Sequence, residues 1–272
     1  MKRSSGIRLC VTVAVSALSL ALITGCSDGG SDKAESNTKS STGDSAQDSS
    51  KNTAKALTAA ELKKRILAQG DVDGYKVATA DALPGGRSGI KGDEKCKPLL
   101  YVLSGVAPAD APAETNRMAT ADKKPSAAAS TDVADMSADE VEKALTDSMS
   151  VDLTMVGLSS YDGDGAEKAL KAVSDAVTGC AGGFTGTAGG EPQKFTKVSA
   201  EKGTGTGDES VAYAAYGERD AEDGTTPVSH AVVVRHGNVV ATYYTMNVGA
   251  MVADKAYTVP AAVITAQSAK LK

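Results

Sequence analysis

Two neighbouring stretches near the C-terminal end carry apolar residues on both faces of an extended strand. They run over 228–235 and 239–248, and a turn at His236-Gly237-Asn238 separates them. A glycine in so short a connection is typical of an antiparallel hairpin. Strands that are apolar on both faces belong in the interior of a sheet, so we expect this hairpin to be central.

Helix and strand patterns alternate in the preceding part of the chain. A Ser or Thr followed three residues later by Glu predicts helix starts at 58–61 and 137–140. Residues 149–155 alternate strictly between apolar and polar side chains, which predicts a half-buried strand. Its apolar positions are Met149, Val151, Leu153 and Met155.

Spacing of apolar residues predicts further helices at 96–103, 166–179 and 258–271 and further strands at 195–200 and 209–217. Strands joined by hairpins argue for an antiparallel sheet. We therefore expect a single α+β domain with the helices packed on one face of that sheet.

The stretch 105–135 gives the weakest structural pattern, because Ala, Pro, Thr, Asp and Lys dominate it. A structureless loop of this length is unusual inside a compact domain. It is either a mobile surface excursion or it contains a short strand near Met118.

The N-terminal segment 1–25 has the features of an export signal. Basic residues precede the apolar run 11–23, which is shorter than the roughly 20 residues that a membrane-spanning helix needs. The run ends in Ile23-Thr24-Gly25-Cys26, which resembles a bacterial lipobox. In that motif the cysteine becomes the first residue of the mature chain and carries lipid.

The lipobox resemblance predicts removal of 1–25 and attachment of a diacylglycerol and an acyl chain such as palmitate to Cys26. Two or more chains anchor a protein stably. We expect the domain to be held on the extracytoplasmic face of the cell membrane. The alternatives are an ordinary secretory signal with an incidental Cys26, or an uncleaved anchor.

A linker is predicted to follow the lipid anchor. Ser27–Ala54 contains no Val, Ile, Leu, Met or aromatic residue, so it lacks the apolar surface that folding requires and should be disordered. The predicted organisation is therefore a signal peptide at 1–25, a lipidated tether at 26–54 and the folded domain at 55–272.

The charge and histidine content exclude some functions. The net charge is −5, and the first 25 residues contain bases but no acid, so the remainder is the more acidic part. An acidic body argues against nucleic-acid binding, which needs a basic surface. The chain has only 2 His, which excludes a His-rich metal site, and we expect no metal and no cofactor.

Four cysteines are present, and two of them belong to the N-terminal segment. Cys10 lies in the leader and Cys26 is the lipidation site, which leaves Cys96 and Cys180. Outside the cytoplasm two remaining cysteines of one domain usually pair, so we predict a disulfide between them. Two free buried thiols are the alternative.

Three short motifs invite a ligand but fit a structural role better. The glycines of 203–207 precede a strand rather than a helix, so they predict a flexible connection and not a phosphate loop. The Asp pairs at 71–73 and 162–164 lack the Gly and Glu of a calcium-binding loop and suit turns and caps.

Catalytic constellations are also weak. The segment 157–161 departs from Gly-x-Ser-x-Gly because Tyr161 takes the last position. His236 falls in the hairpin turn and His230 falls within a strand, where each is more simply a structural residue than a base. We therefore predict that the protein is not an enzyme.

Tyrosines on predicted neighbouring strands are the candidate ligand-binding residues. A tyrosine combines a large apolar body with a polar tip, which suits a binding cleft. In a chain with no Trp and 2 Phe, the same side chains could instead fill the core. The residues concerned are Tyr213, Tyr216, Tyr243 and Tyr244.

The body resembles the extracellular sensor domains of PknH-like actinobacterial kinases and their free-standing lipoprotein relatives over about 57–272. The shared features are Cys96 before a Leu-rich helix, a helix that ends in Cys180, the strand start at 207–211 and the hairpin at 237–240. The resemblance implies an α+β fold with a cleft, no catalytic apparatus and an unidentified ligand. The kinase version has two disulfides, whereas one pair remains here.

These observations together predict a membrane-anchored lipoprotein with a non-enzymatic ligand-binding or sensor-like domain. A carrier of an apolar or lipid ligand and a protein–protein adaptor at the cell envelope are the alternatives. A carrier would show a deep apolar pocket between sheet and helices. An adaptor would show an exposed apolar patch instead.

Overall fold

The computed structural model describes residues 54–81, 83–122, 136–222 and 224–272. The predicted leader and Cys26 lie outside these residues, as does nearly all of the tether. Within the described part, no helix has the length and apolar character that crossing a membrane requires.

The domain is built on one antiparallel sheet of nine strands in the order β1-β3-β4-β9-β8-β7-β6-β5-β2. The strands are β1 (Tyr75–Ala78), β2 (Lys91–Gly92), β3 (Ala113–Ala121), β4 (Leu153–Ser160), β5 (Phe184–Ala188), β6 (Glu191–Glu201), β7 (Glu209–Gly217), β8 (Val228–His236) and β9 (Val239–Met246). The helices are α1 (Ala59–Arg65), α2 (Lys97–Leu103), α3 (Ala138–Met149), α4 (Gly165–Gly179), α5 (Val248–Val252) and α6 (Ala261–Ala269).

The hairpin β8–β9 occupies the middle of the sheet, as predicted from its two apolar faces. Ala231 and Val233 face one hydrophobic core, and Val232 and Val234 face the other. The turn between the strands places Gly237 at φ 60°, a conformation that glycine adopts without strain. The α+β class, the antiparallel sheet and the central hairpin are thus confirmed.

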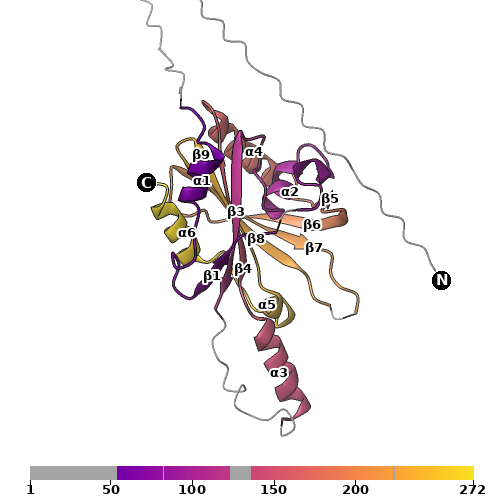
Figure 1. Cartoon of the computed structure of the whole chain (residues 1–272). Coiled ribbons are helices and arrows are strands. Elements are labelled where there is room, and N and C mark those ends of the chain that lie inside the picture. Colours follow the sequence, from indigo (N-terminus) through magenta and orange to yellow (C-terminus); the bar gives the residue numbers. More distant parts are fainter. Residues whose placement is uncertain (1–53, 82, 123–135, 223) are drawn as a thin grey trace, which may run out of the picture. The chain divides into compact units, whose positions relative to one another are not determined.

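The helices are divided between both faces of the sheet, so the expectation that they pack on one face is wrong. Figure 1 shows α2 and α4 on one side and α1 and α6 on the other. Each pair covers its own core of buried side chains. The physical reason lies in β8 and β9, whose valines point both ways and need cover on each face.

The weakly patterned stretch contains a strand at the position of Met118. β3 pairs with β4 along most of its length and with β1 over its C-terminal half. Of the two alternatives for 105–135, a strand near Met118 is therefore confirmed. Residues 123–135 lie outside the described part.

The strand expected at 149–155 starts later than predicted, and the face of Thr154 is buried rather than the face of Leu153. β4 begins at Leu153, and Met149 is the last residue of α3. Leu153 is 37% exposed, whereas Thr154 and Val156 are fully buried. α1 covers the face of Val156, while α2 and α4 make their main contacts with β6–β9 and leave the start of β4 open.

A buried glutamine on α6 holds α1 in place. The capping box at Thr58 and Glu61 forms as predicted, and α1 ends at Arg65. The side chain of Gln267 donates to the carbonyl of Arg65 (2.8 Å) and accepts from the amide of Leu67 (2.9 Å). These bonds replace the next helical turn and fix α1 against α6.

The predicted disulfide is present and joins two helix ends on one face of the sheet. Cys96 precedes α2 and Cys180 follows α4, with their Cα atoms 6.0 Å apart. Both sulfur-bearing residues are buried in the core between these helices and the sheet. The disulfide therefore fastens α2 to α4.

Candidate functional site

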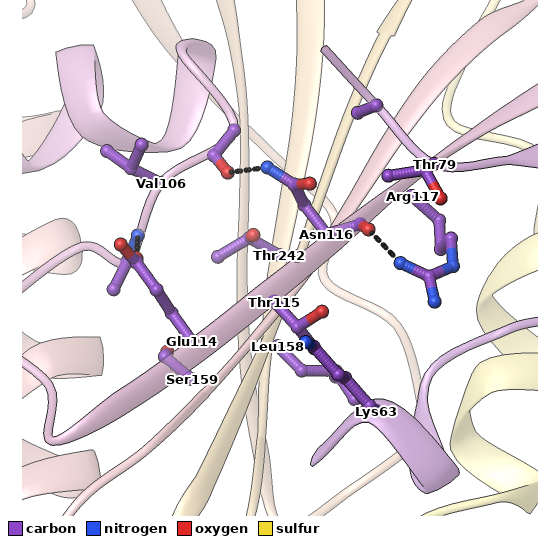
Figure 2. A pocket seen from close by; sticks show the side chains of 14 residues that line it. Lys63, Thr79, Val106, Glu114, Thr115, Asn116, Arg117, Leu158, Ser159 and Thr242 are labelled. Atoms are coloured by element: carbon purple, nitrogen blue, oxygen red, sulfur yellow. Dashed lines mark hydrogen bonds between the residues drawn. The ribbon is translucent and has the colours of Figure 1, made fainter. Parts of the chain in front are cut away.

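A cleft of about 280 Å³ lies along the N-terminal half of β3 (Figure 2). We call it the β3 edge cleft. Its walls come from α1, from the chain after β1, from the loop after α2 and from three strands of the sheet. Its lining residues are Lys63, Thr79, Ala80, Gly105, Val106, Ala107, Glu114, Thr115, Asn116, Arg117, Gly157, Leu158, Ser159 and Thr242.

The cleft exists because β1 is shorter than β3. The last paired residue of β1 is Ala78, opposite Met118, after which Thr79 leaves the sheet. Alternation along the strand directs the backbone N–H and C=O of Glu114 and Asn116 towards the side that β1 has vacated. Among the described residues, no backbone group bonds to either N–H on that side.

The loop that forms one wall of the cleft is fixed by hydrogen bonds to β3. The side-chain amide of Asn116 donates to the carbonyl of Gly105 (3.3 Å), and the amide of Ala107 donates to a carboxylate oxygen of Glu114 (2.7 Å). Arg87 donates to the carbonyl of Ala107 and pairs with Asp110 (2.9 Å). The wall is therefore held in place without a ligand.

Two glycines of the lining, Gly105 and Gly157, have neighbouring side chains too close for a Cβ. A Cβ at Gly157 would lie 2.5 Å from the hydroxyl oxygen of Thr242. Gly105 adopts φ 70°, and a Cβ there would lie 2.7 Å from the side chain of Met155. A larger residue at either position would require the neighbouring side chain to move.

Two cationic side chains belong to the cleft and have no acidic partner among the described residues. Lys63 extends from α1 towards Thr115, and Arg117 follows two residues later on the same face of β3 (Figure 2). Within the described part of the chain, neither forms an ion pair, and Arg117 donates only to the carbonyl of Asn116 (2.8 Å).

Two acidic residues, Glu61 on α1 and Glu114 on β3, accept hydrogen bonds from backbone amides. Glu61 accepts from the amide of Thr58 (2.8 Å), and this bond lowers the pKa of the Glu61 carboxyl. Glu114 accepts from Ala107, as described above. Among the described residues, neither acid forms an ion pair with Lys63 or Arg117.

The four candidate tyrosines do not form one site. Tyr213 and Tyr243 are fully buried in different cores, so each is a core residue. Tyr216 packs beneath the ammonium group of Lys197 (5.1 Å to the ring centre). Burial raises the pKa of Tyr213, Tyr243 and Tyr244 above the ordinary value, so all three stay neutral.

Only Tyr244 of these tyrosines lines a cavity among those described. That second cavity measures about 510 Å³ and lies on the face of α2. Its apolar walls include Leu103, Phe195 and Met246, and its polar walls include Lys194 and Glu218 on the β6–β7 side. Lys194 donates to Glu218, so this cavity carries no unpaired charge from that pair.

Neither histidine lines the β3 edge cleft. His230 contacts the carboxylate of Glu201 (2.9 Å) and the ring of Tyr257 edge-on, with 4.7 Å between ring centres. Burial lowers the pKa of His236, whose ring lies 3.5 Å from the hydroxyl of Ser268. His230 thus contacts residues of β6 and the segment before α6, and His236 contacts α6, so each has contacts typical of a structural residue.

The remaining motifs make local contacts. Asp71 accepts from Ala68 and pairs with Lys270, and Asp162 accepts from Ala56 (2.8 Å). In the described part of the chain, no group of three or more His, Cys, Asp or Glu side chains could hold a metal ion. The glycines of 203–207 connect β6 to β7.

Sequence reasoning missed the polar residues of the β3 edge cleft. Thr115, Asn116 and Arg117 lie in the stretch with the weakest pattern, and Lys63 looks like any exposed residue of an amphipathic helix. The one local sign of the site in the sequence is the short polar run 114–117, which ends in Arg117. Only the register of β1 against β3 shows that this run borders an unpaired edge.

Comparison with known proteins gives little further guidance. No protein-family profile matches the chain, and no curated protein matches it in sequence. Among solved structures, it is similar to the extracellular domain of PknH from Mycobacterium tuberculosis, with 11% identity and a TM-score of 0.45. That match covers 80% of this chain and 95% of the other. A likeness this low says nothing of what the chain binds.

Proposed function

We propose that this chain is a membrane-anchored extracytoplasmic lipoprotein whose folded domain binds a ligand in the β3 edge cleft without catalysing a reaction. The lipobox-like end of the leader at Cys26 supports the anchor. The Cys96–Cys180 disulfide supports a location outside the reducing cytoplasm.

The observation that carries ligand binding is the preformed cleft with two cations, Lys63 and Arg117, that form no ion pair among the described residues. Its loop wall is held by three hydrogen bonds from or to β3 and Arg87, so little ordering is needed when a ligand enters. Ser159, the one serine of the lining, donates to the hydroxyl of Tyr161 (3.1 Å) and has no histidine among the described lining residues. Binding suits this arrangement better than acyl transfer.

Native mass spectrometry of the full chain, purified without denaturation, tests ligand binding. We expect a co-purified mass that disappears in Thr115→Trp, because the indole fills the cleft. Thr120→Trp is the matched control, since it lies on the same strand but outside the lining. If both variants retain the mass equally, the ligand binds outside the β3 edge cleft.

An apolar carrier is distinguished by the same measurement. A lipid-like mass that survives Thr115→Trp and is lost in Met246→Trp would assign the ligand to the second cavity, beside Tyr244. No bound mass in any preparation, and no thermal shift with metabolite mixtures, would contradict a binding role.

The anchor is tested separately. Cys26→Ser should lose acyl labelling, and the chain should leave the membrane fraction or accumulate as the uncut precursor. Unchanged labelling in this variant would contradict the lipoprotein assignment.

An adaptor role is the second candidate, because an exposed apolar patch is also present. Among the described residues, every exposed large apolar side chain lies on α3, on α5 or at the start of β4. These residues are Val141, Leu145, Met149, Leu153, Val248 and Val252. Such a patch is a common mark of an interaction surface.

A further inference from the structure

We propose that the occupant of the β3 edge cleft is an extended peptide that carries a carboxylate. The peptide adds as a short strand to the free edge of β3, and its carboxylate lies between Lys63 and Arg117. This inference rests on the proposed binding function and names the class of ligand.

The backbone of β3 supplies the first half of the recognition. Asn116 and Glu114 direct their N–H groups to the vacated edge, at the spacing of alternate residues that an added antiparallel strand requires. Where β1 ends, Thr79 and Ala80 diverge and line the far side of the cleft. A peptide that takes the place of a longer β1 would satisfy these groups, as in other strand-addition complexes.

The two cations supply the second half. Thr115 and Arg117 project from the same face of β3, and Lys63 reaches that face from α1 (Figure 2). A carboxylate there gains charge-assisted hydrogen bonds from a guanidinium, an ammonium and a hydroxyl. Glu114, the one acidic residue of the lining, projects from the opposite face of β3 and accepts from Ala107 there, so it does not lie between the two cations.

Arg117 links the two halves. In the free chain its guanidinium donates to the carbonyl of Asn116, which is one of the edge groups. An added strand brings its own N–H to that carbonyl, and the guanidinium is then released to the carboxylate. The exchange leaves neither the edge carbonyl nor the guanidinium without a partner.

The size of the cleft limits how much of the peptide it holds. Its volume of about 280 Å³ is just below the roughly 300–1,000 Å³ of pockets for drug-sized ligands. A few residues of an extended chain fit such a space, and the rest of the peptide would continue past it. We therefore expect weak affinity for short probes.

Two-dimensional NMR of the full chain with four probes at millimolar concentration tests the proposal. The probes are acetyl-Val-Thr-Val with a free C-terminal carboxylate, the same peptide as its amide, acetyl-Val-Asp-Val-amide, and succinate. We expect the free acid or the Asp peptide to shift and protect the Asn116 amide. The first indicates a chain terminus as the source of the carboxylate, and the second indicates an acidic side chain.

Charge variants with matched controls locate the carboxylate. Arg117→Gln and Lys63→Gln should each weaken binding of the effective peptide by about tenfold, because hydrogen bonds to charged groups contribute most. Lys64→Gln is the control for Lys63→Gln, since it is the next residue of α1 and does not line the cleft. Its affinity should be unchanged.

Several outcomes would overturn the inference. If the neutral amide peptide binds as well as the free acid, the carboxylate is not recognised. If succinate binds and neither acidic peptide does, the ligand does not add as a strand. If no peptide binds and Arg117→Gln makes the chain associate with itself, the role of Arg117 is instead to prevent pairing between the β3 edges of two copies. A co-purified mass that is lost in Thr115→Trp would then still support a ligand-binding domain, so the two failures are distinguishable.

Discussion

Two amphipathic helices of this chain, α3 and α4, differ in how much of their apolar surface is buried. α4 has 15 residues and buries six of them, whereas α3 has 12 residues and buries none. Both begin at clear sequence marks, which are a turn before Gly165 and a capping box at Ser137 and Glu140. The pattern of apolar residues therefore predicts a helix but not what the helix packs against.

The difference comes from the sheet. α4 lies over β6–β9, and Cys180 at its end joins it to α2. α3 has its main contact with α5, beside which it lies in Figure 1. The approach is close, since a Cβ on Gly249 of α5 would lie 2.4 Å from the carbonyl of Thr146. A short helix gives too little surface to cover an apolar face, so Leu145 stays 60% exposed.

The largest expected effect is on the side of α4. The double variant Cys96→Ala/Cys180→Ala removes a disulfide across a sequence separation of 84, which the chain-entropy relation values at about 4.5 kcal/mol as an upper figure. We expect a large fall in melting temperature by calorimetry. NMR signals of α4 should move more than those of α3. An unchanged melting temperature would show that packing alone holds α4.

The same substitution in each helix gives the sharpest comparison. Leu170 of α4 is 5% exposed and Leu145 of α3 is 60% exposed. Leu170→Ala should cost about 3 kcal/mol of unfolding free energy through lost burial and a cavity. Leu145→Ala should change it by less than about 0.5 kcal/mol. Denaturant titration measures both, and equal losses would mean that α3 is covered in solution.

Local patterns predicted most of the helices and the centre of the sheet. Both capping boxes form, because a Ser or Thr and a Glu three residues later satisfy each other without help from elsewhere. The prediction for 149–155 was wrong about the buried face, because that face is not determined locally. Its alternation is real, but which face is buried depends on α1, which is distant in sequence and covers the face of Val156.

The candidate site was harder to predict than the fold. The disulfide followed from counting cysteines, since the predicted leader and lipidation site take two of the four and leave one pair. The β3 edge cleft depends on where β1 stops pairing and on Lys63 and Arg117 facing one space. No local rule relates those two residues. The tyrosines were expected on neighbouring strands, and that expectation is wrong: β8 separates Tyr213 on β7 from Tyr243 on β9, and the two side chains lie in different cores.

A smaller and purely local effect is expected at the cap of α3. The hydroxyl of Ser137 accepts from the amide of Glu140 (3.4 Å), and Ser137→Ala removes that bond. The loss should be about 1 kcal/mol of local helix stability. Hydrogen exchange of the α3 amides should quicken while the melting temperature stays unchanged. A fall in melting temperature would show that α3 unfolds together with the sheet.

The smallest effect is expected from acid, and it should separate the two helices. Hydrogen bonds from Ser137 lower the pKa of Glu140, and the bond from Lys143 lowers the pKa of Asp147. A carboxyl with a lowered pKa stabilises the folded form fully above its ordinary value, here 4.5 for Glu140 and 3.8 for Asp147. That stabilisation is lost as the pH falls through the lowered values.

α4 provides the internal control for this titration. Asp164 also has a lowered pKa, because Lys168 bonds to it, so both helices lose a favourable carboxylate in acid. α4 keeps its buried face and its disulfide, whereas α3 packs against α5 without burying any of its own side chains. NMR Cα shifts between neutral pH and about pH 3 should therefore show partial loss of helix in α3 and none in α4, since the titration removes carboxylates and leaves buried apolar surface intact. Equal loss in both helices would mean that carboxylates, and not the sheet, decide which helix persists.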